Sequence, residues 1–361
     1  MIEACESCLR RAALLAALAP RIELITARRS GSQARQVLAL PEEKLLAALN
    51  LCGSPLRGGE SKALAGAVEA ASAWAVCIHA GGYPPRLADL GRERPAVLFG
   101  LGRPEALEGE APAITIVGAR RASGYGRATA HALALPLAQA GLTVISGLAS
   151  GVDAAAHRGA LDAGGRTVAV LGTGVDVPYP AGERSTYERI AATGLVLSEM
   201  PPGSRPYRWS FPARNRIMAA LGAITVVVEA AERSGSLITA EMAQDLAREV
   251  GAVPGRVDGR LAAGPNALLA DGAVVVRDAQ DVLDAVLGPG QDLELRPETP
   301  RLDPGLDAVL EAVERGRATP DEVSATTSLS APAAASALAR LELLGRVRSD
   351  VGGRFAPARP R

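Results

Sequence analysis

Three glycine-rich segments, each directly after a short apolar run, carry polar side chains that could bind an anion. The segments span residues 116–126, 145–157 and 171–180. Glycine lets the backbone approach a ligand closely, and a helix that begins just after such a turn points free N–H groups outward. One such turn is ordinary loop chemistry. Three in succession, with Arg120, Ser123 and Ser146 among their residues, favour a phosphate-binding site.

A fourth segment, residues 205–216, combines positive charge with aromatic rings. It holds four arginines, three aromatic residues and no acid. Arginine donates paired hydrogen bonds to phosphate, and an exposed ring can stack on a base for about 1–3 kcal/mol. Phe211 and Trp209 could instead be core residues beside a solvated arginine surface. Because unpaired bases are free to stack, the functional interpretation of this segment is binding of single-stranded nucleic acid.

The remaining polar segments offer little catalytic chemistry. Ser234-Gly-Ser236 follows another apolar run and can cap a helix, bind an anion, or do both. His157 falls one helical turn after Asp153, so a Ser146–His157–Asp153 group can be drawn. The sequence lacks the G-x-S-x-G turn of serine hydrolases, however. We therefore expect no catalytic residue, and we expect His157 to be structural or to contact phosphate.

Common nucleotide-binding fingerprints fit the sequence poorly. Gly118, Gly124 and Gly126 do not have the G-x-G-x-x-G spacing, and no acidic residue for a ribose hydroxyl stands where the dinucleotide fingerprint requires it. A G-K-[ST] tripeptide, which ends the phosphate loop of many nucleotide hydrolases, is also missing from the sequence. We therefore expect neither NAD nor ATP, and no other cofactor.

The polar segments lie between apolar runs that alternate with amphipathic helical stretches. The apolar runs span residues 114–117, 142–145, 167–171, 195–197, 224–228 and 273–276. The helical stretches span residues 125–140, 152–163, 184–192, 213–221 and 237–250. This alternation predicts a Rossmann-like α/β fold, in which helices cover both faces of a parallel sheet. Ligands of such folds bind beyond the carboxyl ends of the strands.

The α/β segment, residues 76–288, is expected to be one of three domains. Residues 1–75 have the pattern of a small helical domain for packing or oligomerisation. A proline-rich linker, residues 289–303, leads to residues 304–361, where three helices precede a hairpin with Gly352-Gly353 at its turn. Three helices followed by a hairpin predict a winged helix.

Composition limits the classes of protein that the chain can belong to. The 361 residues include 39 basic and 39 acidic side chains, so any basic surface for nucleic acid must be local. Cys5-x-x-Cys8 supplies two of the roughly four ligands of a zinc site, so we expect reduced thiols of a cytoplasmic protein and no metal site. The sequence shows neither a secretory leader nor an apolar run of about 18 residues, and we expect no membrane insertion.

Together, the polar segments resemble those of one known family. In chain order they read Gly82-Tyr-Pro-Pro-Arg-Leu87, Val117-Gly-Ala-Arg120, Ser146-Gly-Leu-Ala-Ser-Gly151-Val-Asp153 with His157, Tyr179-Pro180, Ser198-Glu199-x-Pro201, Phe211-Pro-x-Arg214-Asn-Arg216, Glu229-Ala, Ser234-Gly-Ser-Leu-x-Thr-Ala240 and Val253-Pro-Gly255. This set, over about residues 76–286, strongly resembles the DNA processing protein A family (DprA, also called Smf). The flanking domains resemble, more loosely, that family's sterile-alpha-motif-like helical domain and winged helix.

The resemblance implies a non-enzymatic protein of natural transformation and recombination. Such proteins bind incoming single-stranded DNA, protect it from nucleases and load the RecA recombinase onto it, usually as homodimers. The DNA contacts carried over from the family's motifs are Gly118, Ala119, Arg120, Ser146, Gly147, Gly151, Phe211, Arg214, Asn215 and Arg216. The residues' own chemistry adds Arg121, Ser123, His157 and Ser236 as candidates.

One departure from the family pattern affects the expected phosphate contacts. Ala119 stands where the family usually has a serine, so a hydroxyl contact is expected to be lost unless Ser123 or Arg121 replaces it. Whether the winged helix binds duplex DNA or protein stays open at this point.

Two other classes of protein are weaker alternatives. Nucleoside-monophosphate phosphoribohydrolases share the core pattern, but residues 234–239 lack their paired glycines and glutamate. A transcription regulator would act through the winged helix. Residues 301–361 contain nine arginines and eight acids, and a net charge of +1 is weak for binding to duplex DNA.

Overall fold

A computed structural model describes residues 2–26, 36–51, 59–107, 111–290, 304–343, 347–349 and 354–357. The chain folds as two compact units, residues 1–296 and 297–361. None of the helices in the described part of the chain is long and apolar enough to cross a membrane. The expected linker, residues 289–303, falls outside the described residues apart from its first two positions.

The larger unit is built on a ten-stranded sheet with the order β1-β2-β3-β7-β6-β5-β4-β8-β9-β10. Its strands are β1 (Ile2–Glu3), β2 (Trp74–Cys77), β3 (Val97–Gly102), β4 (Ala113–Val117), β5 (Thr143–Ser146), β6 (Thr167–Leu171), β7 (Leu195–Ser198), β8 (Ile224–Val227), β9 (Glu249–Ala252) and β10 (Val274–Val275). Neighbouring strands are parallel, except that β3 is antiparallel to β2 and β7. The predicted Rossmann-like fold with a mostly parallel sheet is confirmed.

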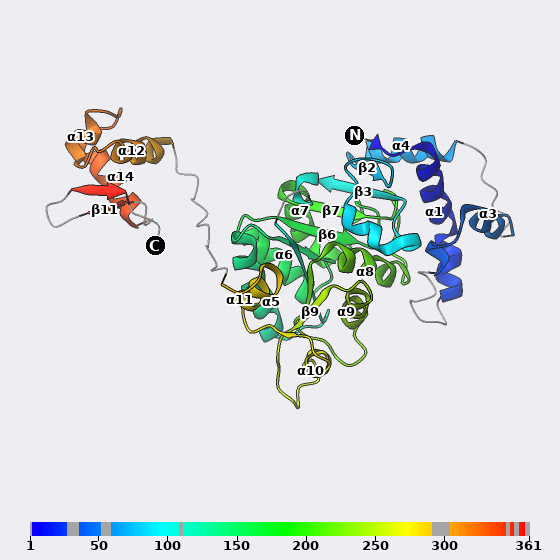
Figure 1. Ribbon diagram of the computed structural model, residues 1–361. Coiled ribbons are helices and arrows are strands. Elements are labelled where there is room, and N and C mark those ends of the chain that lie inside the picture. The colour runs from blue at the N-terminus through cyan, green and yellow to red at the C-terminus, as the bar shows by residue number, and fades with distance from the viewer. Residues whose placement is uncertain are drawn as a thin grey trace. The chain divides into compact units, whose positions relative to one another are not determined.

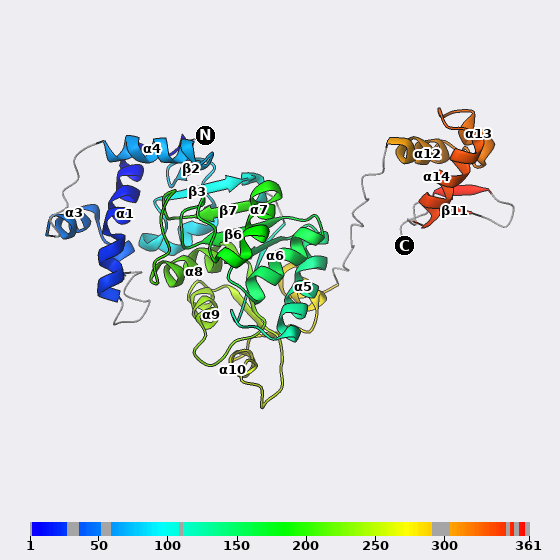
Figure 2. The same cartoon turned by 180° about the vertical axis from the view of Figure 1, so that it is seen from behind.

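Helices cover both faces of this sheet (Figures 1 and 2). The helices that come after β4 in the chain are α5 (Gly124–Gln139), α6 (Val152–Asp162), α7 (Arg184–Thr193), α8 (Ser210–Leu221), α9 (Gly235–Asp245), α10 (Ala263–Ala270) and α11 (Ala279–Leu287). Short 3-10 helices span Pro85–Glu93 (η1), Pro104–Ala106 (η2) and Ala181–Glu183 (η3). One core lies under α5, α6 and α11, and another under α8 and α9. Ile116 of β4 belongs to the first core and Val117 to the second, as expected for a strand buried on both faces.

The order of the strands creates a ligand crevice at one place in the sheet. β4 lies between β5 and β8, so the chain first moves outward through β5, β6 and β7 and then returns to the other side of β4. The loops after β4 and β8 therefore diverge to opposite faces. In open α/β sheets, ligands bind at the carboxyl ends of the strands where the strand order reverses in this way.

The N-terminal residues contribute to the sheet as well as to helices. The helices described there are α1 (Glu6–Thr26), α3 (Glu42–Leu51) and α4 (Glu60–Ala70). β1 precedes them and pairs in parallel with β2. Helices alone were predicted before residue 76, because a two-residue strand is too short to show a period. The indole Nε1 of Trp209 donates to the Ala19 carbonyl of α1 at 3.1 Å, so these helices pack directly on the α/β core.

Two differences from the predicted elements have a clear physical cause. The helix expected over residues 237–250 ends at Asp245, Ala247 has φ +52°, and β9 begins at Glu249. This strand was missed because its apolar residues also fit the helical period. β2 and β3 were missed because they lie toward one end of the sheet, outside the strand–helix alternation, and β3 runs antiparallel to both of its neighbours.

The smaller unit is a compact winged helix. It contains α12 (Pro304–Glu314), α13 (Pro320–Ser324) and α14 (Ala331–Leu343), followed by the antiparallel strands β11 (Val347–Ser349) and β12 (Phe355–Pro357). Thr319 and Glu322 form a reciprocal capping box at the start of α13. Three helices followed by a hairpin were predicted and are confirmed. The Gly352-Gly353 turn lies outside the described residues.

Candidate nucleic-acid interface

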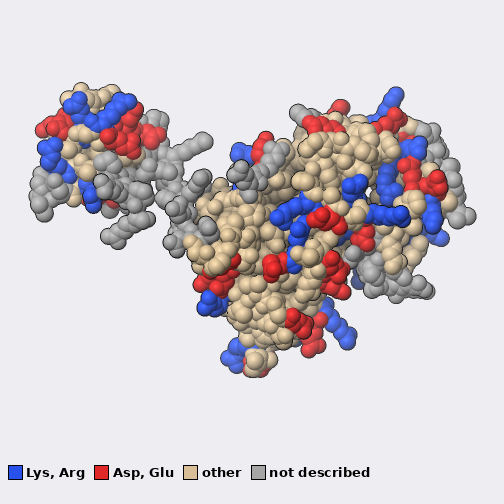
Figure 3. All heavy atoms as spheres, in the orientation of Figure 1, with Lys and Arg blue, Asp and Glu red and all other residues tan. Residues whose placement is uncertain are grey.

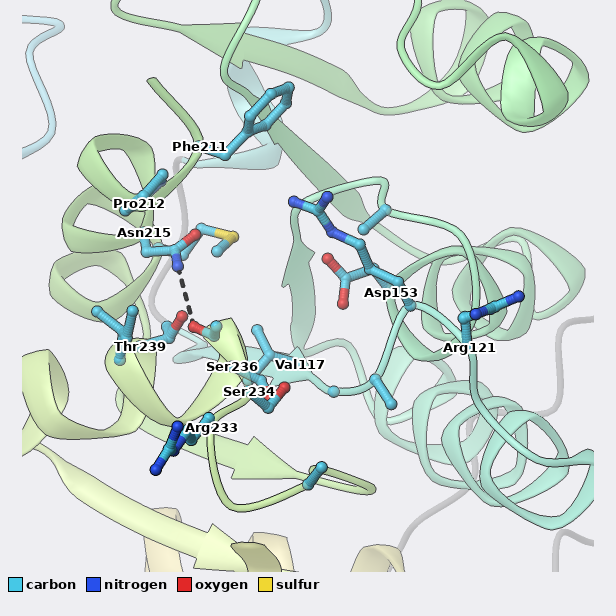
Figure 4. A pocket seen from close by; sticks show the side chains of 18 of the residues that line it. Val117, Arg121, Asp153, Phe211, Pro212, Asn215, Arg233, Ser234, Ser236 and Thr239 are labelled. Carbon is cyan, nitrogen blue, oxygen red and sulfur yellow. Dashed lines mark hydrogen bonds between the residues drawn. The ribbon is translucent and has the colours of Figure 1, made fainter. Parts of the chain in front are cut away.

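A pocket of about 450 Å³ opens at the carboxyl ends of β4 and β8, where the strand order reverses. Figure 4 shows Phe211 and Asn215 on one side of it and Asp153 and Arg121 on the other. Its lining residues come from the loops after β4, β5, β8 and β9, from the first turns of α6 and α9, and from α8 as far as Met218. The pocket thus lies where the sheet topology predicts a ligand.

Positive charge dominates the lining of the pocket. Five arginines and one aspartate line it. The arginines are Arg120, Arg121, Arg214, Arg233 and Arg260, of which all but Arg214 are exposed. On the face drawn in Figure 3, by contrast, basic and acidic side chains are interspersed. A chain with no net charge therefore concentrates positive potential locally, which suits an anionic ligand.

Arg120 and Phe211 form a stacked pair at the pocket. The Arg120 guanidinium carbon lies 5.4 Å from the centre of the Phe211 ring, within the range of a cation–π contact. The ring of Tyr179, from the loop after β6, lies 5.2 Å from the Phe211 ring at a tilt of 33°. Tyr179 and Arg120 are exposed and Phe211 is partly exposed, so this aromatic group is open to a ligand.

Arg214 reaches the pocket from α8 and is largely buried. Its Nη1 donates to the carbonyls of Gly147, at 2.9 Å, and of Val170, and its Nε donates to Asn215 Oδ1 at 3.2 Å. Burial lowers the pKa of Arg214 to about 10, so the side chain remains charged at neutral pH. These partners are neutral oxygens rather than carboxylates. An anion in the pocket can therefore bind Arg214, in competition with the nearby charge of Asp153.

Asp153, in the first turn of α6, is the single acid among the described residues that line the pocket. It is 5% exposed, and its carboxylate accepts the Gly147 N–H at 3.1 Å. Burial raises the pKa of Asp153, and the nearby Arg214 charge opposes that rise. The carboxylate therefore fixes the loop that carries Gly147, and it lines the same pocket as the arginines (Figure 4).

The N-terminal turn of α9 forms another wall of the pocket. Ser234, Gly235 and Ser236 line it, and the two serine hydroxyls lie 2.8 Å apart. Asn215 Nδ2 donates to the Gly235 carbonyl at 3.3 Å, which ties α8 to this turn. Among the described residues, the Thr239 hydroxyl oxygen has no hydrogen-bond partner although the residue is 1% exposed. A buried hydroxyl without a partner at a pocket wall is expected to accept or donate a bond to a ligand.

Most of the sequence-predicted contacts meet at this pocket. Those that line it are Gly118, Ala119, Arg120, Arg121, Phe211, Arg214, Asn215 and Ser236. They come from two chain segments about 90 residues apart and from a third loop after β8. The sheet places these segments side by side because β4 and β8 are hydrogen-bonded neighbours.

Ser123, considered a substitute for the serine missing at position 119, is engaged elsewhere. Its hydroxyl donates to Glu229 Oε1 at 2.6 Å and accepts the Gly126 N–H at 3.0 Å, and its own N–H donates to Glu229 Oε2. Ser123 is therefore the N-cap of α5. Arg121 does line the pocket, so of the two candidate substitutes it is the one placed to contact a phosphate there.

Three predicted DNA contacts, Ser146, His157 and Arg216, are buried and lie outside the pocket lining. Ser146 donates to the Ile116 carbonyl at 2.6 Å, and His157 Nδ1 lies 2.8 Å from the Thr167 hydroxyl. Burial lowers the pKa of His157 to about 3, so it is neutral. These three side chains have internal partners, so we infer that they stabilise the walls around the pocket rather than line it.

Arg216 shows most clearly how a motif residue can be structural. It has no exposed surface, and its Nη2 makes two hydrogen bonds of 2.8 Å to the carboxylate of Glu199. Its remaining nitrogens donate to the carbonyls of Glu93, at 2.8 Å, and Ala213, at 2.7 Å. Every partner is internal, so Arg216 joins α8 to η1 and to the loop after β7.

Gly147 and Gly151 also serve the walls rather than the lining. A Cβ at position 147 would lie 2.5 Å from the Arg214 guanidinium, so only glycine lets that group rest on the loop. Gly151 has φ +94°, and a Cβ there would lie 2.3 Å from the Ala119 carbonyl oxygen. Both glycines were predicted for close approach to a ligand. Here Gly147 makes room for the Arg214 side chain of α8, and Gly151 makes room for the loop after β4.

Sequence reasoning missed several residues of the pocket. Arg233 and Thr239 flank the Ser234-Gly-Ser236 turn that the sequence did single out, so their proximity could have been inferred. Arg260 follows β9, a strand that was not predicted, and its position in the sequence carried no signal.

A separate group of possible metal ligands lies at the start of α1. Cys5, Cys8, Cys77 and His79 offer ligand atoms that all lie within 4.8 Å of one another. Sequence spacing alone indicates two zinc ligands, Cys5 and Cys8. It could not foresee that β1 pairs with β2 and so brings Cys77 and His79 to the same place.

The fold and the pocket together define a class of protein. A doubly wound α/β unit with an arginine-lined pocket at its switch point, in one chain with a winged helix, has the features of a nucleic-acid-binding protein. Comparison with known proteins gives the family. Residues 74–287 match the family model described as DNA recombination-mediator protein A, and residues 294–353 match the DprA winged helix domain. The chain belongs to the DprA family.

Individual relatives agree with this assignment. The chain is 44% identical over 260 residues to a putative DNA processing protein DprA of Mycobacterium tuberculosis, covering 70% of this chain and 66% of that protein. It is 36% identical over 296 residues to protein Smf of Synechocystis, covering 72% and 74%.

Solved structures of the family align with the α/β unit. An X-ray structure of DprA from Streptococcus pneumoniae aligns with a TM-score of 0.56 at 40% identity, covering 59% of this chain and 74% of that one. A structure of the Helicobacter pylori protein, described as giving insight into its single-stranded DNA binding mode, aligns with a TM-score of 0.52 at 30% identity, covering 56% and 92%.

Proposed function

We propose that this protein binds single-stranded DNA in the pocket between β4 and β8. The observation that carries the proposal is the stacked pair of Arg120 and Phe211 beside the buried, charged Arg214. Guanidinium groups neutralise phosphates, and an aromatic ring next to them can stack on a base that is not paired. The arrangement suits a flexible strand whose sequence need not be read.

The geometry suggests how the strand would bind. In the structure, Arg120 lies over the Phe211 ring. When Arg120 turns to bind a phosphate, the ring becomes free to stack on a base. Arg214, held by the Gly147 and Val170 carbonyls, would donate to the same or the next phosphate from the pocket floor. The α9 N-terminus, with Ser234 and Ser236, adds amide and hydroxyl donors on the other side.

The experiment is fluorescence anisotropy with labelled oligo-dT across a salt series. For single strands, the logarithm of the binding constant should fall with the logarithm of salt by about 0.7 per phosphate contacted. Arg120→Ala should weaken binding to all sequences alike and reduce that slope by about 0.7. Arg184→Ala is the matched control, because Arg184 is 65% exposed and lies on α7 outside the pocket lining. Equal affinity and slope for wild type and Arg120→Ala would contradict the proposal.

We further propose the finer role implied by the family resemblance: protection of single strands, loading of RecA onto them, and action as a homodimer without catalysis. The support is membership in a family described as recombination mediators. A nuclease-protection assay and a RecA assembly assay, each with wild type and Arg120→Ala, test the first two roles. Light scattering tests the dimer. Loss of protection with Arg120→Ala is expected, since shielding requires a bound strand.

A hydrolytic role has less support at this site. Glu229, which follows β8, is 7% exposed, and both of its carboxylate oxygens accept hydrogen bonds from Ser123. Of the acids in the described part of the chain, the one that lines the pocket is Asp153, which is 5% exposed and accepts the Gly147 N–H. A phosphoribohydrolase needs an acid directed at the sugar. Incubation with AMP should therefore release no adenine, and measurable release would favour the enzymatic alternative.

Duplex DNA, if it binds, is assigned in this proposal to the winged helix. A chain truncated after Pro289 should keep its affinity for single strands, because the pocket lies wholly within residues 117–261. If the truncated chain loses only its affinity for duplex DNA, the winged helix binds duplex DNA. If duplex affinity is unchanged, the winged helix serves contacts with protein.

A further inference from the structure

Four side chains with metal-binding chemistry converge where the N-terminal helix begins. Cys5 directly precedes α1 and Cys8 lies in its first turn, whereas Cys77 ends β2 and His79 follows it. The two pairs are about 70 residues apart in sequence. They meet because β1 pairs with β2, which sets the start of α1 beside the end of β2.

The distances within the cluster fit a tetrahedral ion. His79 Nδ1 lies 3.4 Å from Cys5 Sγ, 3.4 Å from Cys8 Sγ and 3.9 Å from Cys77 Sγ. Zinc binds sulfur at about 2.3 Å and nitrogen at about 2.0–2.1 Å, so neighbouring ligand atoms of a tetrahedral site lie about 3.5–3.8 Å apart. The three distances to His79 Nδ1 are close to this range, and all four ligand atoms lie within 4.8 Å of one another.

The chemistry of the donors selects zinc among common ions. Three thiolates and one imidazole form a Cys₃His set, which is typical of closed structural zinc sites. All three cysteines are unpaired thiols in the structure. The Cys5 N–H donates to Cys77 Sγ at 3.4 Å, a contact that would support a thiolate as outer partners do in metal sites. Cys8 and Cys77 are buried, which keeps competing water from those two ligands.

We propose that Cys5, Cys8, Cys77 and His79 bind one structural zinc ion that fastens α1 to the edge of the sheet. Binding replaces the three thiol protons, which are released to solvent. The ion closes a loop of about 70 residues between the two ligand pairs, so it should stabilise the folded state chiefly by holding the N-terminal helices on the α/β core. The site is far along the sheet from the DNA pocket, at β2 rather than β4, and the proposal is independent of the proposed function.

The first test is metal analysis of the full chain purified from zinc-supplemented medium without chelators. We expect about one zinc per chain and no iron, measured by mass spectrometry of the elements. Cobalt titrated into the metal-free chain should give the visible absorption of a tetrahedral thiolate site, and zinc should bleach it. A zinc content below about 0.1 per chain together with no cobalt spectrum would overturn the proposal, as would iron as the bound metal.

Variants separate a site from adventitious thiol binding. Cys8→Ser should lower the zinc content at least fivefold, whereas Cys52→Ser, which keeps all four proposed ligands, should leave it unchanged. Equal zinc loss in both variants would contradict the assignment. If Cys8→Ser does not fold, the cobalt spectrum of the wild type still decides the question.

Removal of the ion tests the fastening role. The metal-free wild type should melt at least about 5 °C below the zinc-loaded chain, because a ligand that binds only the folded state raises its stability. Added zinc should restore the melting temperature, while affinity for oligo-dT stays within twofold. Identical melting temperatures with and without zinc would refute the structural role.

Discussion

Arg214 and Arg216 are two residues apart on α8, and both are buried, yet their side chains have different surroundings. Arg214 lines the pocket, and its partners are the oxygens of Gly147, Val170 and Asn215. Arg216 has no exposed surface, and its Nη2 donates to both carboxylate oxygens of Glu199. Arg214 donates its hydrogen bonds to neutral oxygens and lies at the pocket with Asp153 nearby, so its charge can bind a ligand, whereas the charge of Arg216 is paired inside the protein and stabilises the fold.

The same division separates the other polar motif residues. Arg120, Asn215 and Ser236 line the pocket, whereas Ser146 and His157 have their hydrogen bonds inside the core. Substitutions in the first group should change affinity for DNA more than stability. Substitutions in the second group should do the reverse, and this contrast can be tested residue by residue.

The largest effect is expected for Arg216→Ala, and it is an effect on stability. Removing one partner of a buried ion pair leaves the other uncompensated, at a cost of about 3–5 kcal/mol. Urea unfolding followed by circular dichroism measures it, with Arg184→Ala as an exposed control that should change stability little. If Arg216→Ala does not fold, Arg216→Lys provides a measurable intermediate. A loss under 1 kcal/mol would mean that the Glu199 pair contributes little to the fold.

Arg214→Ala should show the opposite balance. Loss of a charged hydrogen bond to phosphate is worth about 1.5–3 kcal/mol, which corresponds to about 10- to 100-fold weaker binding of oligo-dT. Stability should fall less than for Arg216→Ala, because Asp153, whose pKa is already raised by burial, can take up a proton. Unchanged affinity together with a large loss of stability would place Arg214 with the structural group.

The next effect is a pH dependence of stability that arises from His157. Burial lowers the pKa of His157 to about 3 in the folded chain, whereas the unfolded chain has a histidine pKa of about 6.5. Below pH 6.5 the unfolded state therefore binds a proton that the folded state does not. The free energy of unfolding should fall as pH decreases, by at most about 1.4 kcal/mol per pH unit from this group.

His157→Asn removes that group and isolates its contribution. Between pH 6.5 and 5 the variant should lose less stability than the wild type, measured by urea unfolding at each pH. Its affinity for oligo-dT at pH 7.5 should match that of the wild type, since His157 has no exposed surface. Parallel stability curves, or a selective loss of DNA binding in a stable variant, would contradict the structural role of His157.

The smallest effect is expected for Ser123→Ala. Removing the N-cap of α5 should cost about 1 kcal/mol of stability, measured by chemical unfolding. DNA affinity should not change, because the Ser123 hydroxyl is committed to Glu229 and to the Gly126 amide. A clear loss of affinity at full stability would move Ser123 to the group that contacts the strand.

The sequence predicted the sheet better than the roles of individual residues. Strands that are buried on both faces consist of consecutive apolar residues, so β4 to β8 could be recognised in the sequence. Sequence patterns did not reveal four other strands. β1 is too short, β2 and β3 lie toward one end of the sheet, and the apolar residues of β9 also fit a helical period. Glycine-rich strand ends also predicted where the pocket would form.

Whether a polar side chain faces the pocket or the core depends on tertiary partners that a motif does not name. The sequence around α8 does not distinguish Arg214 from Arg216, because their partners lie far away in the chain. Gly147, the partner of Arg214, follows β5, and Glu199, the partner of Arg216, follows β7. The metal-binding cluster was missed for the same reason, since His79 and Cys8 meet through the pairing of β1 with β2. Long-range pairing, rather than residue type, decides these cases.

The most direct test of the pocket is to map where a single strand touches the protein. Oligo-dT that carries photoreactive thiothymidine is cross-linked to the full chain, and the adducts are located by peptide mass spectrometry. The account predicts adducts in residues 118–121 and 211–215, reduced in Arg120→Ala and unchanged in Arg184→Ala. Adducts confined to residues 304–357, with none around β4 and β8, would contradict it.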